Sequence, residues 1–252
     1  MTNIIKESST RIRTGIVLIL AMLILGYIDS YFLFWLVFGI MLLISVSESK
    51  KLFALKSDSV YVYTALLWIV AFFYPMPVDL IFIVAIGYAA QLAYKKKINQ
   101  KLFLPLLYPT ASYLFLLALY SEYGVMTLFW LLVIVGSTDI GAYFVGKRFG
   151  KTLFSETSPN KTIEGVIGGV VFAVIFGTMI APEGLNIVSA IVISSIVSFA
   201  SIFGDLFESY LKREVGLKDS GSILPGHGGV LDRTDGYLFG VIVMLVLLRI
   251  VI

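Results

Sequence analysis

Long apolar stretches alternate with short polar loops along almost the whole chain. A membrane-spanning helix needs roughly 20 apolar residues, with a range of about 17 to 25. Nine runs are expected as spans: Ile12–Tyr27, Tyr31–Val46, Val60–Tyr74, Val78–Tyr94, Phe103–Tyr120, Val125–Phe149, Thr162–Ile180, Leu185–Leu211 and Leu231–Ile252. The first three are short, so a count of eight, with a hairpin that does not fully cross, is the alternative. The pattern predicts an all-α, polytopic membrane protein.

The composition agrees with a membrane protein. The chain has 252 residues, of which 59% are hydrophobic and 14% charged, whereas soluble domains carry about 25% charged residues. There are no cysteines, which excludes disulfides and thiolate metal sites. No signal-peptide cleavage site follows the first apolar run, and no repeat or linker is visible. Residues 1–252 are therefore expected to form a single integral membrane domain, with the catalytic half at about 125–252.

The basic residues predict an orientation. All but one of the 19 Lys and Arg residues fall in alternate loops. These loops carry Lys6, Arg11 and Arg13; Lys50, Lys51 and Lys56; Lys95, Lys96, Lys97 and Lys101; Lys147, Arg148, Lys151 and Lys161; and Lys212, Arg213, Lys218 and Arg233. The exception is Arg249. By the positive-inside rule, the N-terminus is expected in the cytoplasm, and the polar site is expected on the cytoplasmic face of the cell (inner or plasma) membrane.

Acidic side chains inside apolar spans are costly and are functional candidates. Asp139, Asp205 and Glu208 are of this kind. Asp205 and Glu208 are three residues apart and share a helix face, as do Asp232 and Asp235 at the start of the last span. Carboxylates suit Mg²⁺, which binds through one or two of them together with substrate phosphates. The alternative is structural salt bridges to neighbouring bases: Lys212, Arg213 or Arg233.

The segment Leu-Pro-Gly-His-Gly-Gly at 224–229 cannot be a helix, because proline and glycines favour tight turns. Backbone N–H groups at Gly228 and Gly229, just before a helix, can cradle phosphate oxygens. His227 is the only histidine. Its side chain either donates a hydrogen bond to a phosphate or carries a proton, or it caps the turn.

Two further segments carry polar groups. Glycines at 141, 146 and 150 are typical of close helix packing in membranes, whereas Asp139 after Ser137 and Thr138 is a site candidate. In Ser158-Pro159-Asn160-Lys161-Thr162, the proline stops any helix and a new one begins at Lys161 and Thr162. A lysine and a hydroxyl there form an anion site or, alternatively, a positive-inside anchor with an N-cap. Walker A, HExxH and GxSxG motifs are absent.

Together these segments resemble the phosphatidate cytidylyltransferase (CDP-diacylglycerol synthase) family. The resemblance covers about the C-terminal half and rests on residues 203–209 and 209–235, on Ser-Thr-Asp at 137–139 followed by Ala-Tyr at 142–143, and on Ser-Pro-x-Lys-Thr-x-Glu-Gly at 158–165. The N-terminal half matches only as hydrophobic spans. Asn160 and Ile163 stand where the family often has a basic residue and a tryptophan.

The resemblance implies that CTP and phosphatidate react to give CDP-diacylglycerol and pyrophosphate in phospholipid biosynthesis. The hypothesis that follows is that Asp205, Asp232 and Asp235 hold Mg²⁺, with or without a second cation such as K⁺. The expected catalytic set adds Lys218, Asp219 and His227. The expected substrate-binding set is Asp139, Ser158, Lys161, Thr162, Lys212, Arg213, Gly228, Gly229 and Arg233.

The alternative functions involve another lipid or another class of protein. CDP-archaeol synthesis or a lipid-kinase-like phosphorylation of a polyprenol would use the same polar groups on another lipid. An ion-coupled transporter would use the buried acids as a relay, but the polar residues gather on one side and no paired repeats are seen. The expected partners are CTP, phosphatidate and membrane lipid, without nucleic acid. A homodimer is expected only from the size of the protein.

Overall fold

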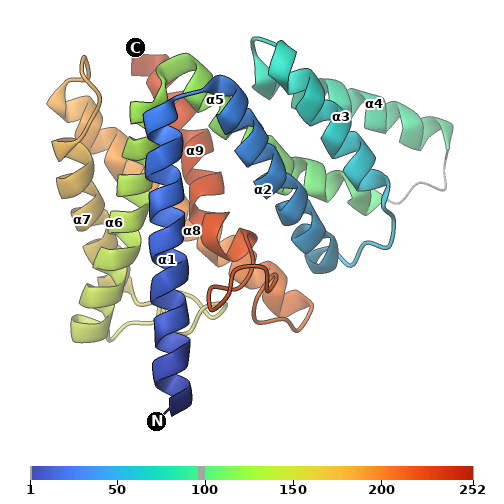
Figure 1. Cartoon of the computed structure of the whole chain (residues 1–252). Helices are drawn as coiled ribbons and strands as arrows, with labels where there is room; N and C mark the ends of the chain where they lie inside the picture. Colours follow the sequence, from blue (N-terminus) through green and yellow to red (C-terminus); the bar gives the residue numbers. More distant parts are fainter. Residues whose placement is uncertain (1, 96–99, 252) are drawn as a thin grey trace. The chain divides into compact units, whose positions relative to one another are not determined.

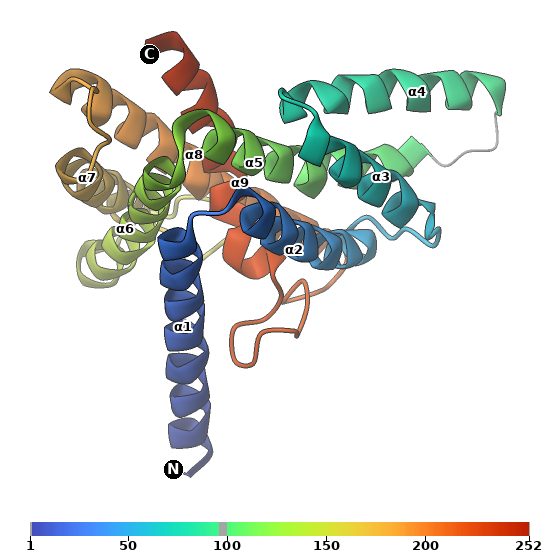
Figure 2. The ribbon, with the colours of Figure 1, turned by 45° about the horizontal axis from the view of Figure 1, so that its top comes forward.

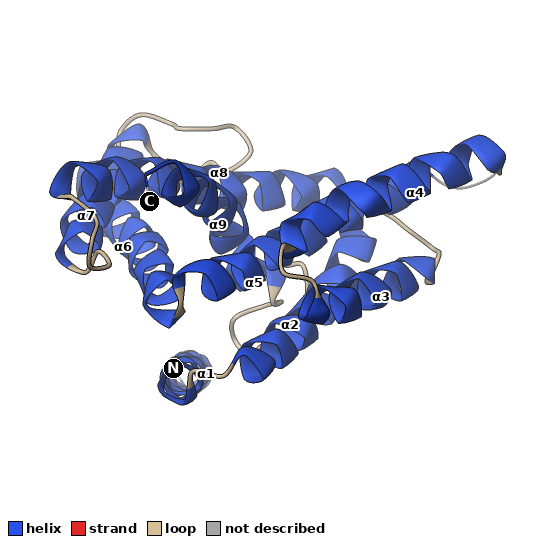
Figure 3. Ribbon diagram, turned by 90° about the horizontal axis from the view of Figure 1, so that it is seen from above, coloured by secondary structure: helices blue, strands red, loops and turns tan. Residues whose placement is uncertain are grey.

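The computed structural model describes residues 2–95 and 100–251. Lys96 and Lys97 of the predicted cytoplasmic loop lie outside the described residues, as does Ile252 at the end of the last predicted span. The described residues form nine α-helices: α1 Thr2–Ile28, α2 Tyr31–Leu52, α3 Ser59–Phe73, α4 Leu80–Tyr94, α5 Ser112–Tyr123, α6 Val125–Phe149, α7 Ile163–Met179, α8 Ile187–Glu214 and α9 Leu231–Val251. Figure 3 shows only helices and loops in this part of the chain. The prediction of an all-α protein is confirmed.

The helices have the length and composition of a multi-pass membrane protein. Within the described residues, six helical stretches are long and apolar enough to cross a bilayer: Tyr31–Leu52, Pro77–Tyr94, Gln100–Tyr123, Val125–Phe149, Ile187–Glu214 and Leu231–Val251. Three shorter apolar helices are Ile12–Ile28, Ser59–Phe73 and Ile163–Met179. The count of nine crossings and the orientation stay predictions.

The predicted span Phe103–Tyr120 is less regular than a single helix. A short helical turn at Gln100–Phe103 and an irregular turn at Leu106–Ala111 precede α5. Pro105 and Pro109 explain this break, because proline has no N–H to donate and its ring clashes with the preceding turn. Tyr108, just before the second proline, is extended, with φ −134° and ψ 113°.

The chain divides into two compact units. The first comprises Met1–Ala118 and Val215–Arg233. Within it α2 lies beside α3 (Figure 1), and two tryptophans join them. The indole N–H of Trp35 donates to the Trp68 carbonyl at 2.9 Å, and that of Trp68 donates to the Trp35 carbonyl at 3.1 Å. This reciprocal pair satisfies both indole N–H groups in a partly buried contact.

The second unit comprises Leu119–Glu214 and Thr234–Ile252. Its most extensive contact is between α6 and α7, which lie side by side (Figures 1 and 2). A Cβ atom on Gly141 would lie 2.7 Å from the Gly168 carbonyl oxygen, and one on Gly150 would lie 2.7 Å from the Thr162 hydroxyl. At Gly146 the distance to the same hydroxyl would be 3.3 Å. The predicted packing role of these glycines is confirmed.

Candidate active site

In the first unit, the segment at 224–229 forms the predicted tight turn. The amide of Leu224 donates to the Gly228 carbonyl at 2.9 Å, and the amide of His227 donates to the Leu224 carbonyl at 2.9 Å. Gly226 and Gly228 have φ values of 75° and 83°, in the left-handed region that favours glycine. The turn therefore depends on its glycines for its shape.

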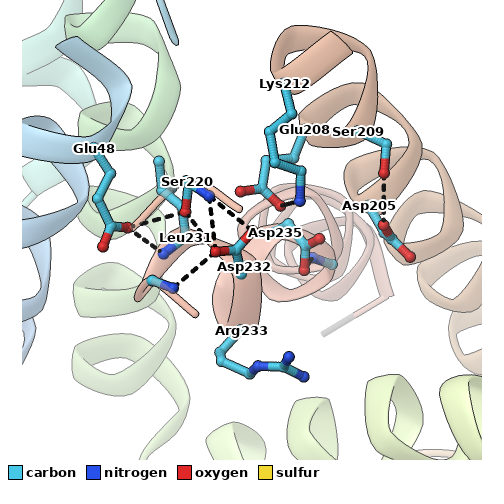
Figure 4. Close-up of polar contacts among 12 residues, drawn as sticks. Glu48, Asp205, Glu208, Ser209, Lys212, Ser220, Leu231, Asp232, Arg233 and Asp235 are labelled. Atoms are coloured by element: carbon cyan, nitrogen blue, oxygen red, sulfur yellow. Dashed lines mark hydrogen bonds and ion pairs between the residues drawn. The ribbon is translucent and has the colours of Figure 1, made fainter. Parts of the chain in front are cut away.

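Asp232, in the first turn of α9, is held by this loop. Its Oδ2 accepts hydrogen bonds from the Gly229 amide at 2.7 Å, the Ser220 hydroxyl at 2.9 Å and the Ser220 amide at 2.9 Å (Figure 4). A Cβ atom on Gly228 would lie 2.7 Å from the same oxygen. Two backbone amides and one hydroxyl therefore fix the position of this carboxylate oxygen.

Glu48 is a buried acid that the sequence reasoning did not find. It lies in α2 with 2% of its surface exposed. Its Oε1 accepts from the Val230 amide at 3.0 Å. Its Oε2 accepts from the Leu231 amide at 2.8 Å and the Ser220 hydroxyl at 3.3 Å (Figure 4). The first N–H groups of a helix have no partner within the helix and carry a partial positive charge. Glu48 therefore stabilises the start of α9.

The other expected residues of this unit are less enclosed. Arg233 donates from Nε to the His227 carbonyl at 2.9 Å, so it ties α9 to the turn. The His227 imidazole is half-buried, and within the described residues its Nδ1 has no hydrogen-bond partner. Lys218 and Asp219 are exposed. The catalytic roles expected of His227, Lys218 and Asp219 stay predictions.

In the second unit, Lys161 and Asp205 form an ion pair. The Lys161 Nζ lies 2.6 Å from Asp205 Oδ2, with 24% and 37% of the two side chains exposed. The other Asp205 oxygen, Oδ1, accepts from the Ser209 hydroxyl at 3.3 Å (Figure 4). The structure therefore pairs Asp205 with a base from the 158–165 segment, and not with one of the three bases that the sequence suggested.

Glu208 and Lys212 form a salt bridge one helical turn apart. Lys212 Nζ lies 3.1 Å from Glu208 Oε2, and the two side chains are 11% and 0% exposed (Figure 4). The salt-bridge alternative for Glu208 is confirmed. Asp235 accepts from the Gly236 amide at 2.8 Å and interacts with both Glu208 and Asp205. Asp235 therefore lies within electrostatic range of two other carboxyl groups of this unit.

The predicted metal ligands divide between the two units, with Asp232 in the first and Asp205 and Asp235 in the second. Among the residues that the structure describes, no three acidic or histidine side chains are arranged to hold a metal ion. Mg²⁺ does not need such a set, because it uses one or two carboxylates and completes its shell with substrate phosphates and water. Asp205 and Asp235, two interacting carboxyl groups of one unit, fit that requirement.

The segment before α7 has the predicted cap. The Thr162 hydroxyl accepts from the Gly165 amide at 3.1 Å, and α7 begins at Ile163. The Ser158 carbonyl accepts from the Lys161 amide at 3.0 Å, which closes the turn before the cap. Asp139 in α6 and Arg213 at the end of α8 are exposed. Anion binding at this segment stays a prediction.

Comparisons with known proteins add independent information. A model of the cytidylyltransferase family matches residues 9–251. A phosphatidate cytidylyltransferase of Helicobacter pylori strain J99 is 44% identical over 246 residues, which cover 96% of this chain and 92% of that protein. Phosphatidate cytidylyltransferases of Bacillus subtilis and Thermotoga maritima are 49% and 42% identical over 123 and 143 residues. These two matches cover 47% and 53% of this chain, and 46% and 53% of those proteins.

Proposed function

We propose that this chain, which belongs to the cytidylyltransferase family, transfers the cytidylyl group of CTP to phosphatidate. The observation that carries the proposal is the 44% identity to a phosphatidate cytidylyltransferase over nearly the full length of both proteins. In this reaction a phosphate oxygen of phosphatidate attacks the α-phosphorus of CTP. The bond from the α-phosphorus to the bridging oxygen breaks, and pyrophosphate leaves. The product is CDP-diacylglycerol.

The residues of the chain suit a reaction between two polyanions. Phosphoryl and nucleotidyl transfer depend mainly on positioning and on neutralising charge. We assign phosphate contacts to Lys161, Arg213 and Lys218, which are exposed or partly exposed. Lys212 is a weaker candidate, because it is buried against Glu208. The Gly228–Gly229 backbone and Thr162 remain proposed contacts to the substrates.

The carboxylates are assigned by their surroundings. Asp205 and Asp235 would hold Mg²⁺, which when bound supplies positive charge to the phosphates of CTP. Asp232 is proposed to contact the substrates from a position that Ser220 and Gly229 fix. A membrane enzyme with this substrate needs access from the cytoplasm for CTP, so we place the polar loops on the cytoplasmic side of the cell membrane. A homodimer remains a proposal.

The test is turnover of labelled CTP by the purified protein in detergent with phosphatidate, with and without Mg²⁺. We expect CDP-diacylglycerol and pyrophosphate only when Mg²⁺ is present. If well-folded protein forms no product with phosphatidate but does with archaeol phosphate or a polyprenol, the choice of lipid is wrong. If it acts on none of these lipids, ion transport is the function to test next.

The same assay tests the assigned carboxylates. Asp232→Asn and Asp235→Asn should each lower turnover by at least about 100-fold, a loss typical of removing a key charged group, while membrane expression is unchanged. The matched control is Asp58→Asn, because Asp58 is an exposed carboxylate whose ion pair is with Lys50 and not with a residue of these loops. Near-normal turnover in both active-site variants would contradict the assignment.

A further inference from the structure

We propose that Glu48 is a positioning residue for Asp232, acting through Ser220 and the start of α9; the inference rests on the proposed function. Glu48 precedes Ser220 by 172 residues and Leu231 by 183 residues. It comes from the N-terminal half of the chain, which resembles the family only as a set of hydrophobic spans. All of its partners belong to the first unit.

The first step of the argument is the shared hydroxyl. The Ser220 Oγ lies 3.3 Å from Glu48 Oε2 and 2.9 Å from Asp232 Oδ2. A serine hydroxyl has one proton to donate, so it can serve only one carboxylate at a time. The position of the Ser220 side chain, and with it one of the donors to Asp232, therefore depends on where Glu48 lies.

The second step is the space around the Glu48 carboxylate. A Cβ atom on Gly229 would lie 2.6 Å from Glu48 Cδ, and one on Gly221 would lie 2.8 Å from the same atom. The loop backbone therefore wraps closely around Glu48 at two points. Gly229 is also the residue whose amide donates to Asp232 at 2.7 Å. A shift of Glu48 would move that donor.

The third step is the cost of placing the acid there. An acidic side chain buried in an apolar helix is expensive unless its oxygens are satisfied. Capping a helix does not require it, because a serine, threonine or asparagine next to the helix does so locally. Glu48 instead reaches from α2, accepts from two backbone amides and shares the Ser220 hydroxyl in the loop that holds Asp232. The need to hold this loop in place accounts for a buried acid at position 48.

Glutamine at position 48 tests the idea with almost no change in size. Its NH₂ group would face the Val230 or Leu231 amide, so one donor would lose its acceptor. We expect Glu48→Gln to lower kcat by about 30- to 100-fold, since misplacement of a catalytic group by about 1 Å can cost roughly that much. The KM for phosphatidate should stay within about threefold, because the lipid contacts are not removed.

Ser220→Ala tests the bridge without disturbing the backbone contacts of either carboxylate, and we expect a loss in kcat of about tenfold. The double variant should lose no more kcat than Glu48→Gln alone, because the effects of two residues that act through the same contacts are not additive. The matched control is Ser45→Ala, which removes the buried hydrogen bond of 3.0 Å between Ser45 and Tyr113 from the same helix. It should retain wild-type kcat.

Limited trypsin digestion gives a readout that does not need turnover. Cleavage after Lys218, which is exposed in the loop, should be faster in Glu48→Gln and Ser220→Ala than in the wild type or Ser45→Ala. If the wild-type protein does not transfer cytidylyl groups, the proposed function is wrong. Digestion would still test whether Glu48 positions the loop. Wild-type kcat or unchanged cleavage in Ser220→Ala would overturn the inference, even if Glu48→Gln fails to fold. An equal loss of kcat in Ser45→Ala would also overturn it.

Discussion

At the scale of single residues, the ion pair between Lys161 and Asp205 has two possible purposes. It joins the segment before α7 to α8 within the second unit at 2.6 Å. Because 24% and 37% of the two side chains are exposed, its contribution to stability is at most about 1 kcal/mol. So weak a contribution does not explain the pair as a structural device. We propose instead that Lys161 meets a substrate phosphate and that Asp205 meets a cation.

Variants of both partners distinguish these purposes. We expect Lys161→Met and Asp205→Asn each to lower kcat/KM for CTP by at least about tenfold, with little change in melting temperature. The double variant should be no more active than the worse single variant, because each charge is needed by the substrate. If the pair is only structural, removing both charges together should restore activity. Steady-state kinetics of the three variants decides between the two outcomes.

Some of these residues could be predicted from the sequence and some could not. The sequence offers Asp205, Asp232 and Asp235 as candidates because acids in or beside apolar runs are rare and costly. Glu48 also lies beside an apolar run, but the predicted run ends at Val46, and the sequence offers no further signal at Glu48. Its partners lie 172 to 183 residues away, and spacing along the chain carries no signal of such contacts.

At the scale of helices, glycine determines how closely α6 and α7 approach. The carbonyl oxygen of Gly168 lies where a side chain on Gly141 would begin. Gly169 repeats the arrangement, because a Cβ atom there would lie 2.7 Å from the Thr138 carbonyl oxygen. Between membrane helices, such small residues permit the van der Waals contact that replaces the hydrophobic effect. The glycine pattern in the sequence predicted this contact.

A pair of alanine variants in α6 tests the interface. Gly141→Ala should lower the stability of the protein in detergent by about 1 to 3 kcal/mol, the usual effect of overpacking. Gly136→Ala is the control in the same helix, because a Cβ atom there meets nothing within 4 Å. Alanine is the better helix former, so this variant should be as stable as the wild type or slightly more stable. Thermal unfolding measures both, and equal destabilisation would contradict the packing argument.

The break before α5 shows where helix prediction from apolar runs fails. The run at 103–120 is continuous in hydrophobicity, so it predicted one helix. Hydropathy does not register that Pro105 and Pro109 lack a backbone donor. The structure satisfies part of the freed backbone with a side chain, since the Thr110 hydroxyl donates to the Pro105 carbonyl at 2.8 Å. The apolar pattern thus predicts which residues form the membrane span, but not whether the span is one regular helix.

At the scale of the whole molecule, the positive-inside rule and the number of crossings make one joint prediction. With nine crossings, the loops after α2 and α8 share a side with the N-terminus, and the loop after α7 lies on the other side. Nearly all basic residues then face the cytoplasm, where CTP is available. A miscount by one crossing between two loops would place them on opposite sides. Orientation therefore tests both the count and the location of the active site.

The lack of native cysteines makes this test direct. Single cysteines replace three exposed residues: Lys51→Cys in the last turn of α2, and Glu183→Cys and Lys218→Cys in the loops after α7 and α8. In intact cells, a membrane-impermeant thiol reagent should label only the position at 183, and permeabilised cells should show labelling at all three. Labelling at 51 but not at 218 in intact cells would mean an odd number of crossings between them. Labelling at both 51 and 218, but not at 183, would place the carboxylate-bearing loops outside, where CTP is scarce, and would contradict the proposed reaction as well as the orientation.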